Sequence, residues 1–421
     1  MRVLHLSTYD ESPGAANFTH TLHTALRRIG VESEMLVGTK LGHDPTVHLL
    51  SGYAQPVRAW LRRKLDEWPL RRHRLGDHVD FSAGWLPGRV VQAARKLAPD
   101  VVHIHWVQHG FLSVSDAARL PLPVVWSLLD HWPFTGGCHY EGDCQRWQQE
   151  CGACPVLRSN RPKDLSHRIW QAKARAWQKR RWWIVSLSEW SRQRAAASPL
   201  LRDHHHASLL VPIDTERWKP LPRAGSRSLL GLPADAFVVA MGAVRADAPR
   251  KGGHLAAAAL RQWTGAQPGR EVWFCVFGDG QLQLESTDKL HVRTLGRLSD
   301  TFSLRTVFSA ADLMIVPSVA DSGPRITGEA LACGTPVLGF PVGIHPEILR
   351  NGINGYLAPM ITPEALMAGL TWGWEARGNT DVRDAARRTA LEQLDANVVA
   401  QRHAEIYARA LNRKASSDSG R

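Results

Sequence analysis

Short runs of apolar and β-branched residues alternate along this chain with segments that have the spacing of amphipathic helices. A helical segment at 14–30, opened and closed by glycine, separates the first two apolar runs. Alternation of this kind predicts a parallel sheet covered by helices on both faces. In the first part of the chain the expected strands are 3–7, 31–38, 101–105, 124–129 and 184–188.

The same pattern restarts after residues 221–228, which contain Pro, Gly and Arg and which we interpret as a linker or long loop. A chain of 421 residues is long enough for two or three domains. The sequence therefore predicts an α/β fold of two Rossmann-like, doubly wound domains that face each other across a cleft. The expected strands of the second domain are 237–241, 272–277, 291–295, 313–316 and 337–340, with helices at 253–263, at 303–310 and after Pro324.

We place the N-terminal domain at 1–205, the second domain at 206–385, and a C-terminal helix with a polar tail at 386–421. The first residues are apolar and β-prone, without the hydrophobic region and cleavage site of a signal peptide. No run of apolar residues is long enough to span a membrane. We therefore expect a cytoplasmic protein.

The formal net charge is +13, which favours anionic partners such as phosphorylated substrates, anionic lipid or nucleic acid. The basic segment 57–75 carries Trp and Leu at helical spacing. This pattern is typical of a helix that lies on an anionic membrane surface, and equally of a helix that packs its apolar stripe on the core. In a second basic stretch, 168–181, we expect Trp170 and Trp177 to pack inward.

Two carboxylates, Asp321 and Glu329, flank the start of the predicted helix that follows Pro324. The loop before this helix and its first turn present backbone N–H groups, which favour an anion. A carboxylate one or two turns into the helix can accept hydrogen bonds from sugar hydroxyls such as those of a ribose. The segment therefore indicates a nucleotide site.

Three segments resemble those of the family 4 retaining glycosyltransferases, which have the GT-B fold of two Rossmann-like domains. Asp321-x7-Glu329, followed by Ala-Leu-Ala-Cys-Gly-Thr-Pro-Val, is similar to the E-x7-E motif of that family. The stretch 242–253 resembles the segment whose Arg and Lys clamp the donor diphosphate, and 211–220 resembles the entry into the second domain. The resemblance spans nearly the whole chain and implies a nucleotide-sugar donor.

The resemblance also implies the residues that bind the donor. Arg245 and Lys251 would clamp the diphosphate, since fixed cations stabilise a leaving group whose charge develops as the glycosidic bond breaks. Glu329 would bind the ribose, and Asp321 with the backbone amides of 322–325 would hold the sugar. The full donor-binding set is Gly14, Arg245, Lys251, Ser322, Gly323, Pro324, Arg325 and Glu329.

Residues 126–140 resemble one branch of the family, the enzymes of bacterial exopolysaccharide and colanic-acid assembly. That branch has a His beside the donor sugar where this chain has Leu129. His131 lies two residues along and could substitute from the same side. The catalytic set implied here is Asp321, His131 and Asp130, and the replacement at Leu129 leaves open an impaired family member that acts as a partner.

Four cysteines cluster at Cys138, Cys144, Cys151 and Cys154. In a cytoplasmic protein such a cluster favours a structural Zn²⁺ site over disulfides, and Cys151-x2-Cys154 has the spacing of a zinc half-site. Two disulfides or free thiols remain the alternatives. Cys275 and Cys333 lie in apolar surroundings and are expected in the core.

These features predict a retaining, metal-independent hexosyltransferase that transfers from a UDP- or GDP-linked sugar to a lipid-linked or oligosaccharide acceptor in cell-surface polysaccharide synthesis. We expect no cofactor for catalysis, and docking at the cytoplasmic face of a membrane through 57–75. A nucleotide-sugar epimerase of the same fold is an alternative. A zinc-containing nucleic-acid-binding protein is disfavoured, because the basic residues are scattered over two α/β domains.

Overall fold

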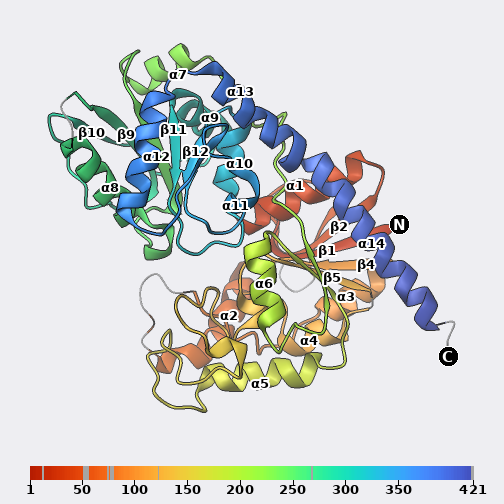
Figure 1. Cartoon of the computed structure of the whole chain (residues 1–421). Coiled ribbons are helices and arrows are strands. Elements are labelled where there is room, and N and C mark those ends of the chain that lie inside the picture. The colour runs from red at the N-terminus through yellow and green to blue at the C-terminus, as the bar shows by residue number, and fades with distance from the viewer. Residues whose placement is uncertain are drawn as a thin grey trace. The chain divides into compact units, whose positions relative to one another are not determined.

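The computed structural model describes residues 1–11, 14–50, 56–73, 75, 80–121, 123–266 and 269–418. The chain forms two compact units, each a sheet covered by helices (Figure 1). Unit 1 comprises Met1–Leu210 together with Val399–Arg421, and unit 2 comprises Val211–Val398. The expected domain boundaries are at 205 and 385, whereas the chain divides after Leu210 and after Val398, and its last segment belongs to unit 1.

Unit 1 is built on a seven-stranded sheet with the order β3-β2-β1-β4-β5-β6-β7, and all of its paired strands are parallel. Its strands are β1 (Arg2–Tyr9), β2 (Glu32–Thr39), β3 (Val47–Leu49), β4 (Val101–Ile104), β5 (Val124–Leu128), β6 (Trp183–Ser186) and β7 (His205–Ser208). Its helices are α1 (Ala15–Arg28), α2 (Pro56–Asp66), α3 (Val90–Leu97), α4 (Val114–Arg119), α5 (Leu165–Trp177) and α6 (Glu189–Ala197).

Unit 2 is built on a six-stranded parallel sheet with the order β10-β9-β8-β11-β12-β13. Its strands are β8 (Val238–Arg245), β9 (Val272–Asp279), β10 (Leu290–Thr294), β11 (Leu313–Val316), β12 (Val337–Gly339) and β13 (Gly355–Leu357). Its helices are α7 (Arg223–Leu230), α8 (Gly253–Gly265), α9 (Thr301–Ala310), α10 (Arg325–Ala332), α11 (His345–Ile348), α12 (Pro363–Glu375) and α13 (Thr380–Thr389), and α14 (Ala396–Asp418) then passes into unit 1.

In both sheets the strand order reverses direction at one point, between β1 and β4 in unit 1 and between β8 and β11 in unit 2. Loops that follow adjacent strands diverge at such a switch point, and ligands of doubly wound sheets bind there, outside the carboxyl ends of the strands. The fold confirms the two Rossmann-like α/β domains that the sequence predicts.

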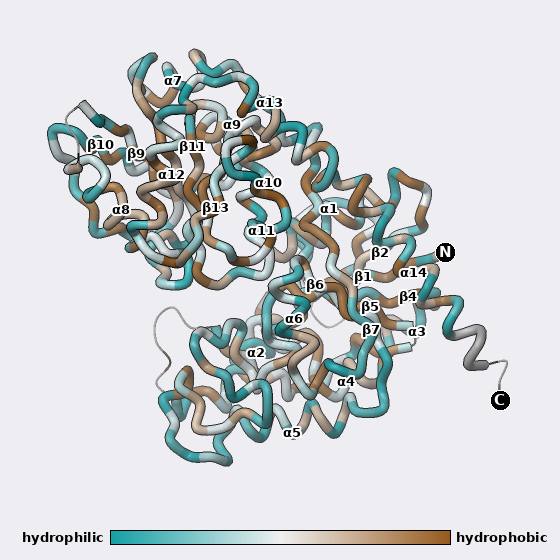
Figure 2. The backbone as a smooth tube through the Cα atoms, viewed as in Figure 1, coloured by the Kyte–Doolittle hydropathy of each residue, from teal (hydrophilic) through white to brown (hydrophobic). Residues whose placement is uncertain are grey.

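Several strands of the two sheets are buried on both faces, as expected where helices cover both sides. In β11 all four residues are buried, and so are all five of β5. Figure 2 shows hydrophobic tracts along these strands. Trp170 and Trp177 lie in the core of unit 1, as predicted, and Cys275 and Cys333 are fully buried in unit 2.

One secondary-structure prediction is wrong. Residues 223–228 of the expected linker 221–228 belong to helix α7 (Arg223–Leu230), which is followed by Gly231 with φ +62°. Its Arg227 is buried and donates from Nη2 to Asp312 Oδ2 at 2.7 Å and from Nε to the carbonyl of Ala310 at 3.1 Å. The charge of Arg227 suggested a solvated loop, but the buried partner Asp312, 85 positions along the chain, cannot be recognised from local composition.

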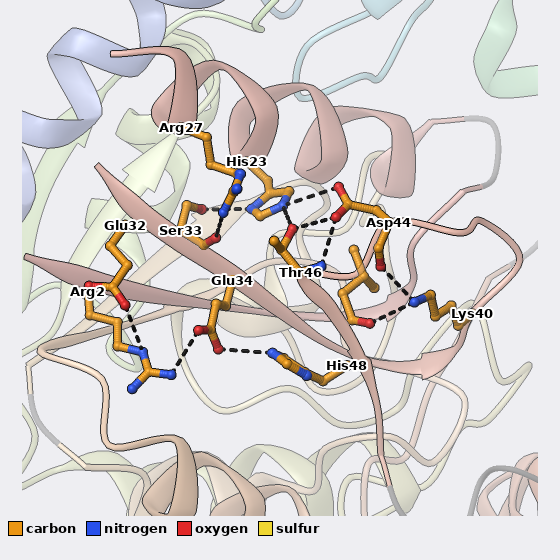
Figure 3. Close-up of polar contacts among 11 residues, drawn as sticks. Arg2, His23, Arg27, Glu32, Ser33, Glu34, Lys40, Asp44, Thr46 and His48 are labelled. Atoms are coloured by element: carbon orange, nitrogen blue, oxygen red, sulfur yellow. Dashed lines mark hydrogen bonds and ion pairs between the residues drawn. The ribbon is translucent and has the colours of Figure 1, made fainter. Parts of the chain in front are cut away.

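Side chains of β1, β2 and β3 form a polar network at one edge of unit 1 (Figure 3). Arg2 donates to Glu34 Oε1 at 2.8 Å, and Glu34 Oε2 lies 2.9 Å from His48 Nε2. His23 of α1 lies 2.7 Å from Ser33 Oγ and 2.9 Å from Thr46 Oγ1. These contacts hold helix α1 and the short edge strand β3 to the rest of the sheet.

The basic segment 57–75 forms α2 and a 3-10 turn at Trp68–Arg72. Five of its apolar residues are exposed, whereas Ala59, Leu70 and Leu75 pack on the core of unit 1, so the segment has features of both expected arrangements. The exposed members are Val57 at 71%, Trp60 at 59%, Leu61 at 49%, Leu65 at 43% and Trp68 at 55%.

We predict that His345, in the first turn of α11, makes stability depend on pH. Its ring is buried between Thr327 Oγ1 and the carbonyl of Phe340, at 2.8 Å from each, and burial lowers its pKa from 6.5 to about 4. Between these values the unfolded chain binds a proton that the folded chain does not, so the free energy of unfolding falls as the pH is lowered through this window. The loss between about pH 7 and about pH 5 should be about 2 kcal/mol larger in the wild type than in His345→Gln, measured by urea unfolding. Equal losses in the two proteins would contradict this prediction.

Candidate active site

The loops that follow β8 and β11 touch each other at the switch point of unit 2. The backbone N–H of Val319 donates to the carbonyl of Arg250 at 2.9 Å. Gly252, at φ +68°, lies so close that a Cβ there would be 1.8 Å from the carbonyl oxygen of Pro317. Only glycine satisfies both the left-handed conformation and this approach.

This junction brings Asp321 against two cations from the other loop. Lys251 Nζ donates to Asp321 Oδ2 at 2.6 Å, and Arg250 Nη1 lies 3.7 Å from the same oxygen. The second oxygen of Asp321 accepts from the backbone N–H of Gly323 at 3.2 Å. The Asp321 side chain is 10% exposed and that of Lys251 is 22% exposed, so the pair is only partly open to solvent.

Both members of this pair remain charged. Burial raises the pKa of Asp321, but Lys251 and Arg250 outweigh it and hold the pKa below 3.8. Burial lowers the pKa of Lys251 from 10.5, and the attraction of Asp321 opposes that change. The site is therefore a compensated cluster of two cations and one anion, able to exchange an internal partner for an anionic ligand.

Glu329 lies on α10 one turn after Arg325, and the two side chains pair at 2.8 Å between Arg325 Nε and Glu329 Oε1. Arg325 Nη1 also donates to the carbonyl of Pro212 at 3.2 Å. The Glu329 side chain is 13% exposed, and the guanidinium holds it in one orientation.

Pro324 precedes α10 and has no backbone N–H, and the N–H of Gly323 is taken by Asp321. Two of the four backbone positions that the sequence suggested as donors to the sugar therefore do not present a free N–H. Ser322 is fully buried beside them.

Arg245, at the end of β8, is the most open cation of the site. Its side chain is 51% exposed and meets Asp247 at 3.1 Å. A Cβ on Gly280 would lie 2.2 Å from the Asp247 carboxylate, so the loop after β9 also approaches this position. Arg245 can therefore reach a ligand above the carboxyl ends of β8 and β9.

The remaining predicted site residues lie in unit 1. Gly14 precedes α1 with φ +86°, and a Cβ there would meet no atom within 4 Å. The backbone conformation, rather than crowding, is the reason for glycine at this position.

Asp130 follows β5 and holds three neighbours. Its Oδ2 lies 2.7 Å from His139 Nδ1 and accepts from Trp106 Nε1 at 2.9 Å, and its Oδ1 accepts from the backbone N–H of Trp132 at 3.0 Å. Burial raises the pKa of Asp130, but His139 and the hydrogen bonds lower it by a larger amount, so the carboxylate is ionised. Asp130 orients His139 rather than His131.

His131 is fully buried, with its Nδ1 2.5 Å from Glu141 Oε2 and its ring between those of Phe134 and Tyr140. Glu141 in turn accepts from Arg194 Nε at 3.1 Å. The suggestion that His131 replaces the histidine absent at Leu129 stays a prediction, and His139, which is paired with Asp130 and 5% exposed, is a second candidate for that role.

All six cysteines lie in the described part of the chain, and all six are free thiols. Cys138 and Cys154 pack in one small apolar cluster with Phe81 and Leu157. Burial raises the pKa of Cys138 and brings that of Cys151 to about 12, so these thiols are protonated without a metal. Among the described residues the four sulfur atoms do not form a group of three ligands within 4.8 Å, and a zinc site there stays a prediction.

Four residues around the predicted site residues were not predicted from the sequence. Arg250 lies near Asp321, His139 pairs with Asp130, and Glu141 contacts both His131 and Arg194. Arg250 stands beside Lys251 in the predicted clamp, so its position was a usable signal. Glu141 and Arg194 are 53 residues apart and meet only through the fold.

Comparison with known proteins bears on this geometry. A family model described as glycosyl transferases group 1 matches residues 236–374, which include both loops of the switch point. The D-inositol 3-phosphate glycosyltransferase of Mycobacterium leprae is 35% identical over 352 residues, which cover 80% of this chain and 73% of that protein. The chain belongs to the group 1 glycosyltransferase family. It is therefore a sugar-transferring enzyme, a hexosyltransferase, as the sequence predicts.

Solved structures support the fold of this glycosyltransferase. The sucrose-phosphate synthase of Thermosynechococcus elongatus superimposes with a TM-score of 0.65 at 15% identity, over 97% of this chain and 99% of that one. Anabaena HepE in complex with UDP-glucose superimposes with a TM-score of 0.63 at 17% identity, over 97% of this chain and 100% of that one. None of the described helices is both long and apolar enough to cross a membrane.

We predict that Gly252→Ala disrupts the switch point. A Cβ at φ +68° and 1.8 Å from the Pro317 carbonyl forces the two loops apart, so the free energy of unfolding should fall by about 2 kcal/mol or more. Gly265→Ala is the control, since no atom lies within 4 Å of its Cβ position in the last turn of α8, and the change should be neutral or stabilise by up to about 1 kcal/mol. Urea unfolding of both variants measures the difference, and equal stabilities would refute the close approach.

Proposed function

We propose that this glycosyltransferase is retaining and metal-independent, and transfers a hexose from a nucleotide sugar to a lipid-linked or oligosaccharide acceptor in cell-surface polysaccharide synthesis. The observation that carries the proposal is the cluster of Arg245, Arg250 and Lys251 at the β8/β11 switch point of unit 2, next to the carboxylates Asp321 and Glu329. Three cations at the carboxyl ends of parallel strands suit a diphosphate.

The diphosphate would take over Lys251 from Asp321. Because the Lys251–Asp321 pair is partly buried, a ligand that supplies its own negative charge can exchange with the carboxylate at small cost in desolvation. Asp321, released from Lys251, could then accept a hydrogen bond from a hydroxyl of the donor sugar. Glu329, held by Arg325, would accept hydrogen bonds from the ribose hydroxyls.

Cations fixed before the reaction stabilise the leaving diphosphate without reorganisation as its charge develops. In the retaining chemistry that we propose, the acceptor hydroxyl attacks from the side on which the diphosphate departs. The departing phosphate oxygen takes the hydroxyl proton, so no carboxylate base is required. Gly14, Asp130 and His131 of unit 1 are also predicted site residues, and their part in this step stays a prediction.

A lipid-linked acceptor is suggested by the exposed apolar and basic residues of α2 and the 3-10 turn that follows it. The exposed Trp60, Leu61 and Trp68 share this segment with the exposed cations Arg63, Lys64, Arg71 and Arg72. Apolar residues that enter the interfacial region, together with cations that meet anionic headgroups, are the features of a helix docked on a membrane surface. A lipid-linked acceptor at the cytoplasmic face would lie where such docking places the enzyme.

A second candidate acceptor is inositol 3-phosphate, which the 35% identical mycobacterial relative is named for. Such an acceptor is soluble and needs no membrane. The two candidates therefore differ in whether vesicles bind the enzyme and in whether transfer requires them.

We predict that one of UDP, GDP, ADP and dTDP raises the melting temperature well above the others, because a ligand stabilises the state that it binds. Arg245→Ala and Lys251→Ala should abolish the shift. Arg377→Ala, which removes an exposed cation of unit 2 that contacts only Trp374 in the contacts described, should leave the shift unchanged. A panel in which no nucleotide shifts the melting temperature of the wild type would remove the donor-site assignment.

We predict that the wild type sediments with vesicles containing phosphatidylglycerol and much less with pure phosphatidylcholine. A variant with Trp60→Ser, Trp68→Ser, Arg71→Glu and Arg72→Glu should bind the anionic vesicles at least about tenfold more weakly. Arg62 is left unchanged because it donates to the carbonyls of Pro87 and Gly110 within unit 1.

The charge-matched control is Arg95→Glu with Lys96→Glu, on the exposed end of α3. It alters the net charge as much as the changes at Arg71 and Arg72 in the 3-10 turn and should keep vesicle binding within about twofold of the wild type. If both variants weaken binding equally, net charge alone explains the association. If all three proteins bind equally, the segment 57–75 does not dock the enzyme, and the soluble acceptor is favoured.

A further inference from the structure

The interior of unit 1 contains a layer of histidines where a doubly wound sheet normally has aliphatic residues. His5 of β1 pairs in register with His103 of β4. His105 follows two residues later and so points to the same face of the sheet. All three are at most 2% exposed.

The three rings lie close enough to share one ion. The ring centroids of His103 and His105 are 4.0 Å apart, and those of His5 and His105 are 5.1 Å apart. One nitrogen from each ring can be chosen so that all three lie within 4.8 Å of one another, and among the described residues this is the one group of three such ligands.

Hydrogen bonds within the protein do not satisfy this cluster. A neutral imidazole has one N–H and one lone pair. His5 Nδ1 and His105 Nε2 share one proton across 2.8 Å, while His5 Nε2 and His105 Nδ1 are buried with no hydrogen-bond partner among the described residues. Whichever ring donates, one buried N–H and one lone pair stay unused, which costs free energy unless another group binds there.

Other buried histidines of the chain show what a satisfied one looks like. Both ring nitrogens of His345 are hydrogen-bonded, to Thr327 and to the carbonyl of Phe340, and those of His23 are bonded to Ser33 and Thr46. His5 and His105 differ from these in having an unused nitrogen each. His131, His206 and His403 also have one buried ring nitrogen without a partner among the described residues. His5, His103 and His105 differ from these in having ligand atoms within 4.8 Å of one another.

The surroundings hold the third ligand in place. His103 lies 2.7 Å from Tyr407 Oη of α14 through Nδ1 and 2.8 Å from Ser127 Oγ of β5 through Nε2. Both partners are hydroxyls that can rotate, so one can release its nitrogen to an ion while the other orients the ring, as partners of ligating histidines do. The titratable groups that act on the three rings are themselves histidines, His23 and His403 among them.

We propose that His5, His103 and His105 form a structural binding site for a divalent first-row transition metal of the Zn²⁺ class. Neutral imidazole nitrogens suit this class of cation, and carboxylates, which Mg²⁺ and Ca²⁺ require, do not take part. Nitrogen ligands bind zinc at about 2.0–2.1 Å, so the rings have to move by about 1 Å or less to surround the ion.

When the ion binds, the proton between His5 Nδ1 and His105 Nε2 moves to the other nitrogen of its own ring, so both rings stay neutral and no electrons are transferred. Three protein ligands leave a fourth position, which a water molecule or, after a rotamer change, His403 Nε2 can fill. That nitrogen is also buried without a partner among the described residues. Because Tyr407 and His403 belong to α14, the metal ties the C-terminal helix to the sheet of unit 1.

The test uses the full chain, expressed in minimal medium with added Co²⁺ so that the buried site fills during folding. We expect about one equivalent of cobalt per chain by elemental mass spectrometry, and a visible d–d absorption without the near-ultraviolet charge-transfer band of cobalt thiolates. A charge-transfer band would instead place the ion on the four cysteines and overturn the histidine site. Absence of cobalt from the folded wild-type protein would also overturn it.

Matched variants separate loss of a ligand from loss of folding. His105→Gln should lose the cobalt and its absorption, while Cys138→Ser with Cys154→Ser should keep both. His345→Gln is the control for removing a fully buried histidine elsewhere in the chain and should also keep both. Retention of stoichiometric cobalt by folded His105→Gln, checked by circular dichroism, would refute the proposal. None of these measurements depends on transferase activity.

Discussion

The candidate site depends on the close approach of two backbone segments that follow adjacent parallel strands. Gly252 and Pro317 are in contact because no side chain stands between them, and the hydrogen bond from Val319 to Arg250 joins the same two loops. Lys251 and Asp321 meet only because these loops meet. The electrostatics of the site are thus a consequence of sheet topology, since β8 and β11 are neighbours although 67 residues lie between the end of β8 at Arg245 and the start of β11 at Leu313.

The site is a set of internal ion pairs, Lys251 with Asp321, Arg325 with Glu329, and Arg245 with Asp247. Lys251, which would bind the diphosphate, is held by Asp321, which would accept a hydrogen bond from a sugar hydroxyl. Such pairs keep partly buried charges compensated before a ligand arrives. They also make an anionic, hydroxyl-rich ligand a better match than a bare anion, since the ligand must supply partners for both signs at once.

The fold could be predicted from the sequence for reasons that are local, and the donor-binding role of the switch-point residues stays a prediction. The strands and helices of a doubly wound sheet can be recognised from the alternation of apolar and amphipathic segments along the sequence. The residues of the switch point follow the ends of strands directly. Side-chain pairs between distant parts of the chain could not be predicted from the sequence. Examples are Arg227 with Asp312, Glu141 with Arg194, and His139 with Asp130, each of which joins separate elements or loops. The sequence could list the partners, but only the register and crossovers of the sheet determine which of them meet.

His131 and the histidine layer of unit 1 both show that sequence spacing does not determine whether a histidine is buried. A histidine at a strand end can face a ligand or be enclosed, and the spacing in the chain is the same in both cases. His131 is enclosed, with Nδ1 held by Glu141 and Nε2 without a partner among the described residues, whereas His139 has both ring nitrogens bonded, to Asp130 and to Ser82. In the layer of His5, His103 and His105 the enclosure is complete, yet two nitrogens are left without partners, and incomplete hydrogen bonding in a fully buried cluster is a better sign of a missing ligand than exposure is.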